Sequence, residues 1–477
     1  MLFSSITFLV LFLPIVLLVY YYCPIIKAKN YILLLTSLIF YAWGEPKYVL
    51  VMLLSIAINY RMGLWIGETS YTVSKRKIIL AIAITVNLLL LFYFKYLGFS
   101  ELVINKIFRI IDYPQFQIPI LSIALPIGIS FYTFQSISYL VDVYKKPILV
   151  QKNLLDIGLY ISFFPALIAG PIVRYHDINE QIKNRTHRLD LFVQGIEIFI
   201  IGLSKKILIA NTMAKAADTI LALTPNSVPA FYILLGIVSY SLQIYYDFSG
   251  YSDMAIGLGK MFGFKILENF NYPYISKSVT EFWRRWHISL SSWFKDYLYI
   301  PLGGNRKGKF RTTINLFIVF FATGLWHGAA INFIFWGMGH GILLFIEKTS
   351  SSKLSTRFKD GIVKNILSHI YTICSIMLLW LFFRLEIRSS LNFIKNLFLF
   401  NSGNENIAAY IKLSIAAQYY VYLFFAILFA FPWWRKIHLN GNHYSLLVRY
   451  TALVILLVLS ICTLATNAYN LFIYFRF

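Results

Sequence analysis

The sequence predicts an all-α polytopic membrane protein of about 10 to 13 transmembrane or re-entrant helices. The first observation is a mean hydropathy of +0.68 over 477 residues. The second is that charged residues make up only 13% of the chain. The third is that apolar runs of helical length recur from one end to the other. Since a transmembrane helix needs about 20 apolar residues, these runs favour repeated crossings of a bilayer.

The first apolar run, Leu2 to Tyr22, has no charge, no basic segment before it and no small-residue cleavage site after it. It is therefore predicted to be a retained span rather than a removed signal peptide. Several later runs are shorter than about 20 residues, so some spans are expected to be broken, tilted or re-entrant. These runs are Tyr31 to Ala42, Tyr48 to Tyr60, Ile78 to Phe94, Ile118 to Val141, Leu154 to Val173, Leu191 to Ile209, Ala230 to Tyr246, Ile314 to Leu325, Ala329 to Phe345, Ile366 to Phe383, Tyr419 to Phe431 and Leu446 to Tyr474.

No long linker, internal repeat or low-complexity tail divides the chain. The most polar long stretch, residues 247–311, lies between apolar runs. We therefore expect a single membrane domain over residues 1–477, with a polar catalytic insert at about 247–311.

The formal net charge of +23 arises from 43 Lys and Arg residues against 20 Asp and Glu residues. Short basic loops between apolar runs are typical of the positive-inside rule and of contact with anionic headgroups. The lipid bilayer is therefore the expected partner of this charge, and no nucleic acid is expected. Lys27 and Lys29 fit a cytoplasmic loop. Lys205 and Lys206 do not fit a regular alternation of basic cytoplasmic loops and less basic external loops. Either a segment fails to cross the bilayer or basic residues line a cavity.

The most unusual histidine is His327, which lies among small and apolar residues in the segment Thr323 to Ala330. A titratable group in such a setting is costly and indicates a function. A neutral imidazole there could take a proton from a hydroxyl group near pH 7. The alternative is a histidine that bonds a backbone carbonyl between helices. On a continuous helix it would share a face with Ile331, Ile334 and Met338.

A second histidine, His287, lies in a segment crowded with charged and aromatic residues. If Thr280 caps a helix here, Glu281 and Arg285 form an i, i+4 pair. The same helix would place three side chains along one face: Trp283, His287 and Ser291. The alternative is an amphipathic helix at the membrane interface with Trp286 and Trp293 at headgroup depth.

Two carboxylates, Asp247 and Asp253, follow directly on an apolar run, and Ser249-Gly250 between them predicts a helix break. Either carboxylate could orient a catalytic imidazole or hold a hydroxyl substrate. Alternatively, Asp253 caps the helix that begins at Met254, and Asp247 pairs with a buried arginine.

A turn-rich basic loop follows at residues 297–311. The spacing of Gly303, Gly308 and Lys309 approaches a phosphate-binding P-loop, but Phe310 stands where a Ser or Thr must bind magnesium, so nucleotide hydrolysis is not supported. Three of its cations could contact the phosphates of a carrier such as coenzyme A, or anionic lipid: Arg306, Lys307 and Lys309.

Several other chemistries lack their motifs. The chain has no Gly-x-Ser-x-Gly elbow, no His-Glu-x-x-His and no Cys-x-x-Cys, and its three cysteines are scattered. We expect no metal site and no permanently bound cofactor. A histidine-based reaction without an obvious covalent nucleophile remains.

These residues resemble the membrane-bound O-acyltransferase (MBOAT) family and, within it, the membrane subunits of bacterial alginate O-acetyltransferases. The resemblance runs through nearly the whole chain. It is carried by Met1 to Ser5, Phe40 to Trp43, Leu125 to Tyr132, Ile168 to Pro171, Tyr246 to Gly259, Glu281 to Leu290 and Gly324 to Gly328.

The resemblance implies that His327 is the catalytic residue and that His287 is a second histidine needed for activity. It also implies helices around a central catalytic channel. From its chemistry we expect His327 to act as a general base, and a transient acyl-histidine is the alternative. Charged and aromatic neighbours of these elements are the candidates for substrate binding or support: Asp247, Asp253, Arg284, Arg285, Trp286 and Trp326.

The activity implied is transfer of an acetyl group from a cytoplasmic donor, acetyl-CoA, across the bacterial cytoplasmic (inner) membrane. The acceptor would be an extracytoplasmic polysaccharide or peptidoglycan, reached with an extracytoplasmic SGNH-type acyltransferase or esterase as partner. One alternative is D-alanyl transfer to teichoic acid from a carrier-protein thioester. Another is a transporter or flippase of lipid-linked saccharide, which broken spans and intramembrane charges would also suit.

Overall fold

The computed structural model describes the chain except residues 122, 358–360, 416, 434–442, 467–471 and 473–477. All regular elements in the described part are helices, and no strand occurs among these residues. The predicted all-α class is confirmed. The end of the predicted run from Leu446 to Tyr474 lies largely outside the described residues.

The chain divides into two compact units, and each is built from separate stretches of sequence. The first comprises Met1–Ile196, Ala255–Leu267 and Gly328–Ala330, and the second comprises Glu197–Met254, Glu268–His327 and Ile331–Phe477. The expectation of one membrane domain over residues 1–477 stays a prediction.

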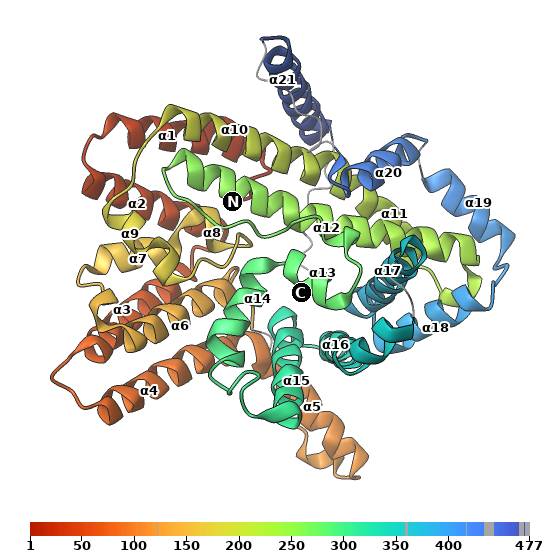
Figure 1. Cartoon of the computed structure of the whole chain (residues 1–477), viewed down its shortest axis with the longest axis horizontal. Coiled ribbons are helices and arrows are strands. Elements are labelled where there is room, and N and C mark those ends of the chain that lie inside the picture. Colours follow the sequence, from red (N-terminus) through yellow and green to blue (C-terminus); the bar gives the residue numbers. More distant parts are fainter. Residues whose placement is uncertain (122, 358–360, 416, 434–442, 467–471, 473–477) are drawn as a thin grey trace. The chain divides into compact units, whose positions relative to one another are not determined.

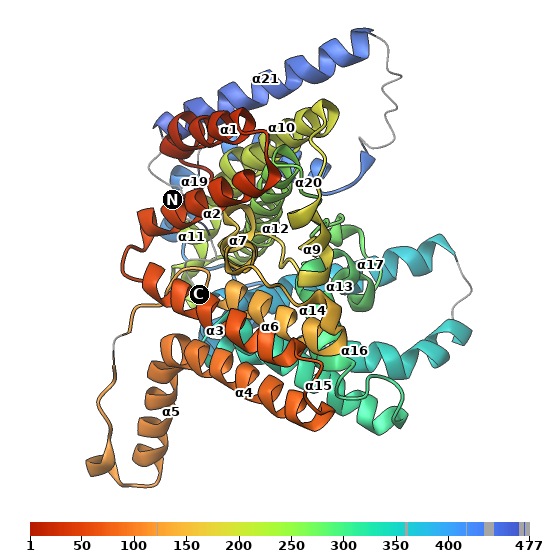
Figure 2. The same cartoon turned by 90° about the vertical axis from the view of Figure 1, so that its left-hand side faces the viewer.

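The first unit is a group of helices. Its helices are α1 (Leu13–Tyr22), α2 (Ile26–Gly44), α3 (Val49–Gly67), α4 (Val73–Leu91), α5 (Leu97–Ile110), α6 (Ile129–Lys145), α7 (Leu154–Ser162), α8 (Phe164–Leu167), α9 (Tyr175–Lys183) and the first half of α10 (Leu189–Ser204), with π-helical turns at Thr7–Phe12 and Phe92–Tyr96. Figure 1 and Figure 2 both show α3, α4 and α6 side by side. Asn59 and Asn87 join α3 to α4 through two reciprocal amide hydrogen bonds of 3.1 and 2.8 Å, which suits helices with little water between them.

The second unit holds the remaining helices. They are the end of α10 with the π-helical turn Lys205–Ala210, α11 (Asn211–Leu221), most of α12 (Ala230–Met261), α13 (Val279–Arg285), α14 (Ile288–Phe294), the π-helical turn Lys295–Tyr299, α15 (Gly308–His327), α16 (Ile331–Arg357), α17 (Ile362–Arg384), α18 (Ile387–Phe398), α19 (Glu405–Ser414), α20 (Gln418–Phe429) and α21 (His443–Thr466). The polar insert at 247–311 therefore contains the end of α12, all of α13 and α14, and the start of α15.

Glycines let two helix pairs of the second unit approach closely. A Cβ on Gly250 of α12 would lie 2.7 Å from the carbonyl oxygen of Gly202 in α10. The predicted break at Ser249-Gly250 is wrong: α12 continues through it, because this glycine serves helix packing rather than a turn. In the same way, a Cβ on Gly324 of α15 would lie 2.5 Å from the carbonyl oxygen of Phe333 in α16.

The sequence predicts about 10 to 13 transmembrane or re-entrant helices, but fewer helices of the structure are suited to be complete membrane spans. Among the described residues, four helices are long and apolar enough to cross a membrane: Val49–Gly67, Val73–Ile110, Ile362–Arg384 and Ser445–Thr466. The helices α19 and α20, bent by 78°, give a fifth if they form one broken span. Other predicted runs are divided, as the run from Leu154 to Val173 is by the break between α7 and α8.

Candidate active site

His287 lies at a sharp break between two short helices. The predicted single helix over residues 280–293 is wrong, because α13 ends at Arg285 and α14 begins at Ile288. His287 has φ 44° and ψ 53°, a left-handed conformation that cannot continue a helix. Such strain in a residue other than glycine clusters at functional sites.

The start of α13 also differs from the prediction in one residue. The cap is Ser278 rather than Thr280, since the Ser278 hydroxyl accepts a 3.0 Å hydrogen bond from the backbone N–H of Glu281. The predicted pair of Glu281 with Arg285 is confirmed at 2.9 Å.

Asn269 holds the break in place. Its backbone oxygen accepts from the N–H of Ile288 at 2.9 Å. Its side-chain Oδ1 accepts from the backbone N–H and the hydroxyl of Ser289 at 3.1 and 2.9 Å, and its Nδ2 donates to Ser252 of α12 at 2.9 Å. Sequence reasoning missed this residue, whose only signal was its place in the polar stretch.

The same asparagine assigns the tautomer of His287. The side-chain atom of Asn269 that faces the backbone N–H of Ser289 must be the oxygen, because an N–H can only donate, and this same Oδ1 lies 3.2 Å from His287 Nδ1. Nδ1 therefore carries the proton, and Nε2 keeps a lone pair. Nε2 is buried and has no hydrogen-bond partner among the described residues. Burial lowers the pKa of His287, which lies outside the spanning helices, to about 3, so the imidazole is neutral at pH 7.

His327 is the last residue of α15 and is buried. The predicted helix face shared with Ile331, Ile334 and Met338 is wrong, because the helix stops at His327 and α16 starts afresh at Ile331. The chain reverses here so that α16 can pack back along α15. The end of a helix therefore presents this imidazole.

The structure brings the two histidines together. Their ring centroids lie 6.5 Å apart. Trp326 lies beside both rings, at 5.8 Å from His287 and 4.9 Å from His327. Trp336 and Phe383 each lie 5.1 Å from His327. We call these five residues the histidine pocket. Aromatic walls keep water away from the two imidazoles, which strengthens any electrostatic interaction formed there.

Each of the two candidate aspartates is paired with a lysine of the π-helical turn that follows α10. Asp247 lies 2.6 Å from Lys206, and both side chains are almost fully buried. Asp253 lies 2.6 Å from Lys205, and this pair is about one quarter exposed. The predicted capping role of Asp253 is wrong, since it lies inside α12, and the partner of Asp247 is a lysine rather than an arginine. We call these the lysine–aspartate pairs.

The remaining candidates of α13 have different surroundings. Arg285 is held by Glu281 and by the carbonyl oxygen of Asn271 at 3.1 Å. Trp286 is buried against Phe282 and Trp380, with ring centroids 5.4 and 5.0 Å away. Its indole packs within the protein, so the alternative of an interfacial helix does not describe it.

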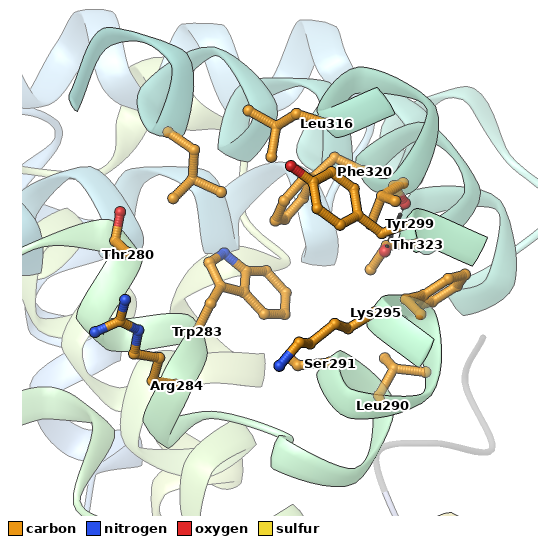
Figure 3. A pocket seen from close by; sticks show the side chains of 13 residues that line it. Thr280, Trp283, Arg284, Leu290, Ser291, Lys295, Tyr299, Leu316, Phe320 and Thr323 are labelled. Atoms are coloured by element: carbon orange, nitrogen blue, oxygen red, sulfur yellow. Dashed lines mark hydrogen bonds between the residues drawn. The ribbon is translucent and has the colours of Figure 1, made fainter. Parts of the chain in front are cut away.

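Arg284 is exposed and lines a cavity of about 250 Å³ among α13, α14 and α15, shown in Figure 3. The walls are mostly apolar and include Trp283. The Ser291 hydroxyl, which has no hydrogen-bond partner among the described residues, and the Lys295 ammonium group add polar positions. Thr323, also in the wall, lies one helical turn before His327. Trp283 in the cavity wall lies 5.9 Å from Trp336 of the histidine pocket, so the cavity and the pocket are neighbours.

The basic loop lies at the other end of α15. Arg306, Lys307 and Lys309 are exposed. With a helical rise of about 1.5 Å per residue, Lys309 lies about 27 Å from His327 along the helix axis. The structure does not bring these cations to the histidines. Tyr299, however, connects the two regions, because it lines the cavity and donates a hydrogen bond to Asn305 of the loop.

Residues 145–386 match the model of the MBOAT, membrane-bound O-acyltransferase, family. The chain is 39% identical to the probable alginate O-acetylase AlgI of Pseudomonas putida, with 100% of both chains covered. It is 44% identical to the protein of the same name from Pseudomonas aeruginosa, over 81% of this chain and 72% of the relative. It is 34% identical to the peptidoglycan O-acetyltransferase of Helicobacter pylori, over 100% of this chain and 98% of the relative.

More distant similarity reaches the teichoic acid D-alanyltransferase of Bacillus subtilis, at 31% identity over 52% of this chain and 66% of the relative. The family match covers α7 to α17 and so includes both histidines, the lysine–aspartate pairs and the cavity. The chain is an integral membrane acyltransferase and belongs to the membrane-bound O-acyltransferase family.

Proposed function

We propose that this protein moves an acetyl group from acetyl-CoA across the membrane, onto an acceptor hydroxyl group, for the O-acetylation of an extracytoplasmic polysaccharide or peptidoglycan. The observation that carries the proposal is the approach of His287 and His327 to 6.5 Å within one buried aromatic pocket. Two imidazoles at such a place are suited to proton transfer, and they lie beside a cavity that could admit an acyl donor.

In the proposed reaction, His327 takes the proton of the acceptor hydroxyl while the oxygen attacks the thioester carbonyl carbon. The C–S bond breaks, and the thiolate leaves with the proton that His327 had taken. General-base assistance of this kind contributes about 10²- to 10⁴-fold to the rate. His287 has its lone pair on Nε2, so its role is to accept a hydrogen bond that orients the hydroxyl group, rather than to donate one to the oxyanion.

The cavity and the basic loop support a thioester donor that carries phosphates. Arg306, Lys307 and Lys309 would contact the phosphates of coenzyme A, and Arg284 and Lys295 would line the path of its arm. The apolar wall would hold the acyl end near Thr323, one turn from His327. Acetyl-CoA is consumed as a substrate in this scheme and is not a resident cofactor.

The names of the most similar relatives support the acceptor class, since they are an alginate O-acetylase and a peptidoglycan O-acetyltransferase. We place the protein in the bacterial cytoplasmic membrane, with an SGNH-type acyltransferase as the extracytoplasmic partner that passes the acetyl group to the polymer. Lys27 and Lys29 lie in the first turn of α2 rather than in the predicted loop, and this end of the helix then faces the cytoplasm.

D-alanyl transfer to teichoic acid is the second candidate, and the similarity to a D-alanyltransferase favours it. The same two histidines would serve, with a carrier-protein thioester as donor. Family membership supports either transfer over a transporter of lipid-linked saccharide.

The test is mild alkaline release of ester-linked groups from cell-envelope polymers, identified by mass. Cells carry the wild type, a deletion, His327→Ala, or the control His369→Ala, whose imidazole bonds the carbonyl oxygen of Ser276 away from the pocket. Acetate should vanish in the deletion and in His327→Ala, and should persist in His369→Ala. Unchanged acetate with an equally abundant His327→Ala protein would remove His327 from the chemistry, and release of D-alanine would favour the second candidate.

A further inference from the structure

Two buried cations of the first unit have no part in the proposed reaction. Lys29 is 6% exposed and Arg185 is 9% exposed. Within the described residues, no carboxylate oxygen lies within 4.0 Å of either side-chain cation. Burying a positive charge without an anion is costly, so two such charges in one place require an explanation.

Neutral groups orient the cations without neutralising them. The Lys29 ammonium group lies 4.9 and 5.3 Å from the ring centroids of Tyr20 and Tyr21. Arg185 donates through Nε to the Tyr20 hydroxyl at 3.1 Å and through Nη1 to Asn30 Oδ1 at 2.7 Å. Arg185 Nη2 is buried and has no hydrogen-bond partner in the described part of the chain. Among the described residues, neither Arg185 Nη2 nor the Lys29 ammonium group therefore has a hydrogen-bond acceptor.

The start of α2 adds a third source of positive potential. Lys29 lies in the first turn of α2, which has no acidic residue there and no side-chain cap at Ile25. A cation is disfavoured at a helix N-terminus, whereas an anion is stabilised there. Lys29 occupies a position that becomes favourable once an anion binds.

The neighbouring titratable groups offset the two cations only in part. His187, whose Nε2 lies 2.7 Å from the Tyr20 hydroxyl, has its pKa lowered to about 4 by burial and by the nearby Lys29 and Arg185. Its imidazole is therefore neutral at pH 7. Asp156 accepts a hydrogen bond from the amide of Asn30 at 3.4 Å and attracts Arg185 through space, so one carboxylate faces two cations. The charge of the cluster stays positive.

We propose that Lys29, Arg185 and the first turn of α2 bind a phosphate group. A phosphate carries enough negative charge for two cations, and its oxygens accept hydrogen bonds from several directions at once. The group comes either from the headgroup of an anionic lipid or from a soluble phosphate compound such as coenzyme A. The site uses none of the residues proposed for acetyl transfer, and coenzyme A bound there would be additional to the donor proposed at the loop of residues 297–311.

The test compares Lys29→Met with Lys27→Met, because Lys27 is exposed and lies two residues away on the same helix. In one arm, native mass spectrometry counts phosphatidylglycerol retained by the full-length protein in mixed phosphatidylcholine and phosphatidylglycerol nanodiscs. In the other arm, calorimetry measures coenzyme A binding in nanodiscs of phosphatidylcholine alone. We expect Lys29→Met to weaken binding about tenfold or more in one arm, Lys27→Met to change it less than about twofold, and Lys29→Arg to retain it.

The arm in which Lys29→Met loses binding identifies the source of the phosphate. Equal binding by wild type and Lys29→Met in both arms would overturn the proposal. Equal loss in Lys29→Met and Lys29→Arg would also contradict it, since the site depends on charge. If Lys29→Met does not insert or fold, Lys29→Gln replaces it, and thermal unfolding in ligand-free nanodiscs confirms that each variant is folded.

Discussion

The histidine pocket and the lysine–aspartate pairs belong to the same unit, and both hold buried titratable groups. In the buried ion pair of Lys206 with Asp247, each charge is compensated by an opposite charge 2.6 Å away. In the pocket, by contrast, His287 keeps a buried Nε2 without a hydrogen-bond partner in the described residues. The difference separates structural from chemical use of polar groups: a satisfied pair holds helices together, whereas an unsatisfied lone pair is available to a substrate.

The largest effect on stability is expected when one partner of the buried ion pair is removed. Asp247→Ala leaves the Lys206 charge buried without its partner, which should reduce the free energy of unfolding by about 3 to 5 kcal/mol. Titration with denaturant in detergent micelles measures this loss. The double variant Lys206→Met with Asp247→Leu should recover most of it, because no isolated charge remains. A fully stable Asp247→Ala protein would show that the pair is not a structural element.

An intermediate effect is expected at Asn269, which fixes the tautomer of His287. Asn269→Asp keeps the shape and still accepts from Nδ1, but its carboxylate stabilises the imidazolium and so raises the pKa of His287. Because the reaction requires neutral His287, the acidic limb of the pH profile of acetyl transfer should move to higher pH. At pH values below the raised pKa of His287, the rate should fall about tenfold. A profile that keeps its shape and falls uniformly would indicate that Asn269 only supports the fold.

The smallest effect is expected at the partly exposed pair. Water screens Lys205 and Asp253, whose side chains are 27% and 25% exposed. Asp253→Asn should therefore change the free energy of unfolding by about 0 to 1 kcal/mol. Measured beside Asp247→Ala under the same conditions, it serves as the matched control for burial. An equal loss of unfolding free energy in the two variants would show that burial does not explain the effect of Asp247→Ala.

Much of the fold follows from local sequence patterns. Apolar runs predict the helices, and a spacing of four residues predicts the pair of Glu281 with Arg285. The two histidines were identified from their unusual neighbours and from family resemblance. These features depend on residues that are close in the chain.

The features that sequence reasoning missed depend on distant contacts. Asn269 bonds groups 17 to 20 residues away, and those contacts create the break at His287. Asp253 finds Lys205 at a separation of 48 residues. No local periodicity specifies such partners. The glycine at position 250 has two possible roles, a turn or a close helix crossing, and only the opposite helix decides between them.

The backbone at His287 carries a consequence for how this protein evolves. A left-handed conformation suits glycine or asparagine best, and a residue with a large ring pays in stability to adopt it. The chain nevertheless has an imidazole there. His287 is thus a position of stability–activity trade-off, where the substitution that most relaxes the fold also removes the side chain needed for chemistry. Selection for stability alone would favour the replacement of His287 and would therefore give a more stable but inactive enzyme.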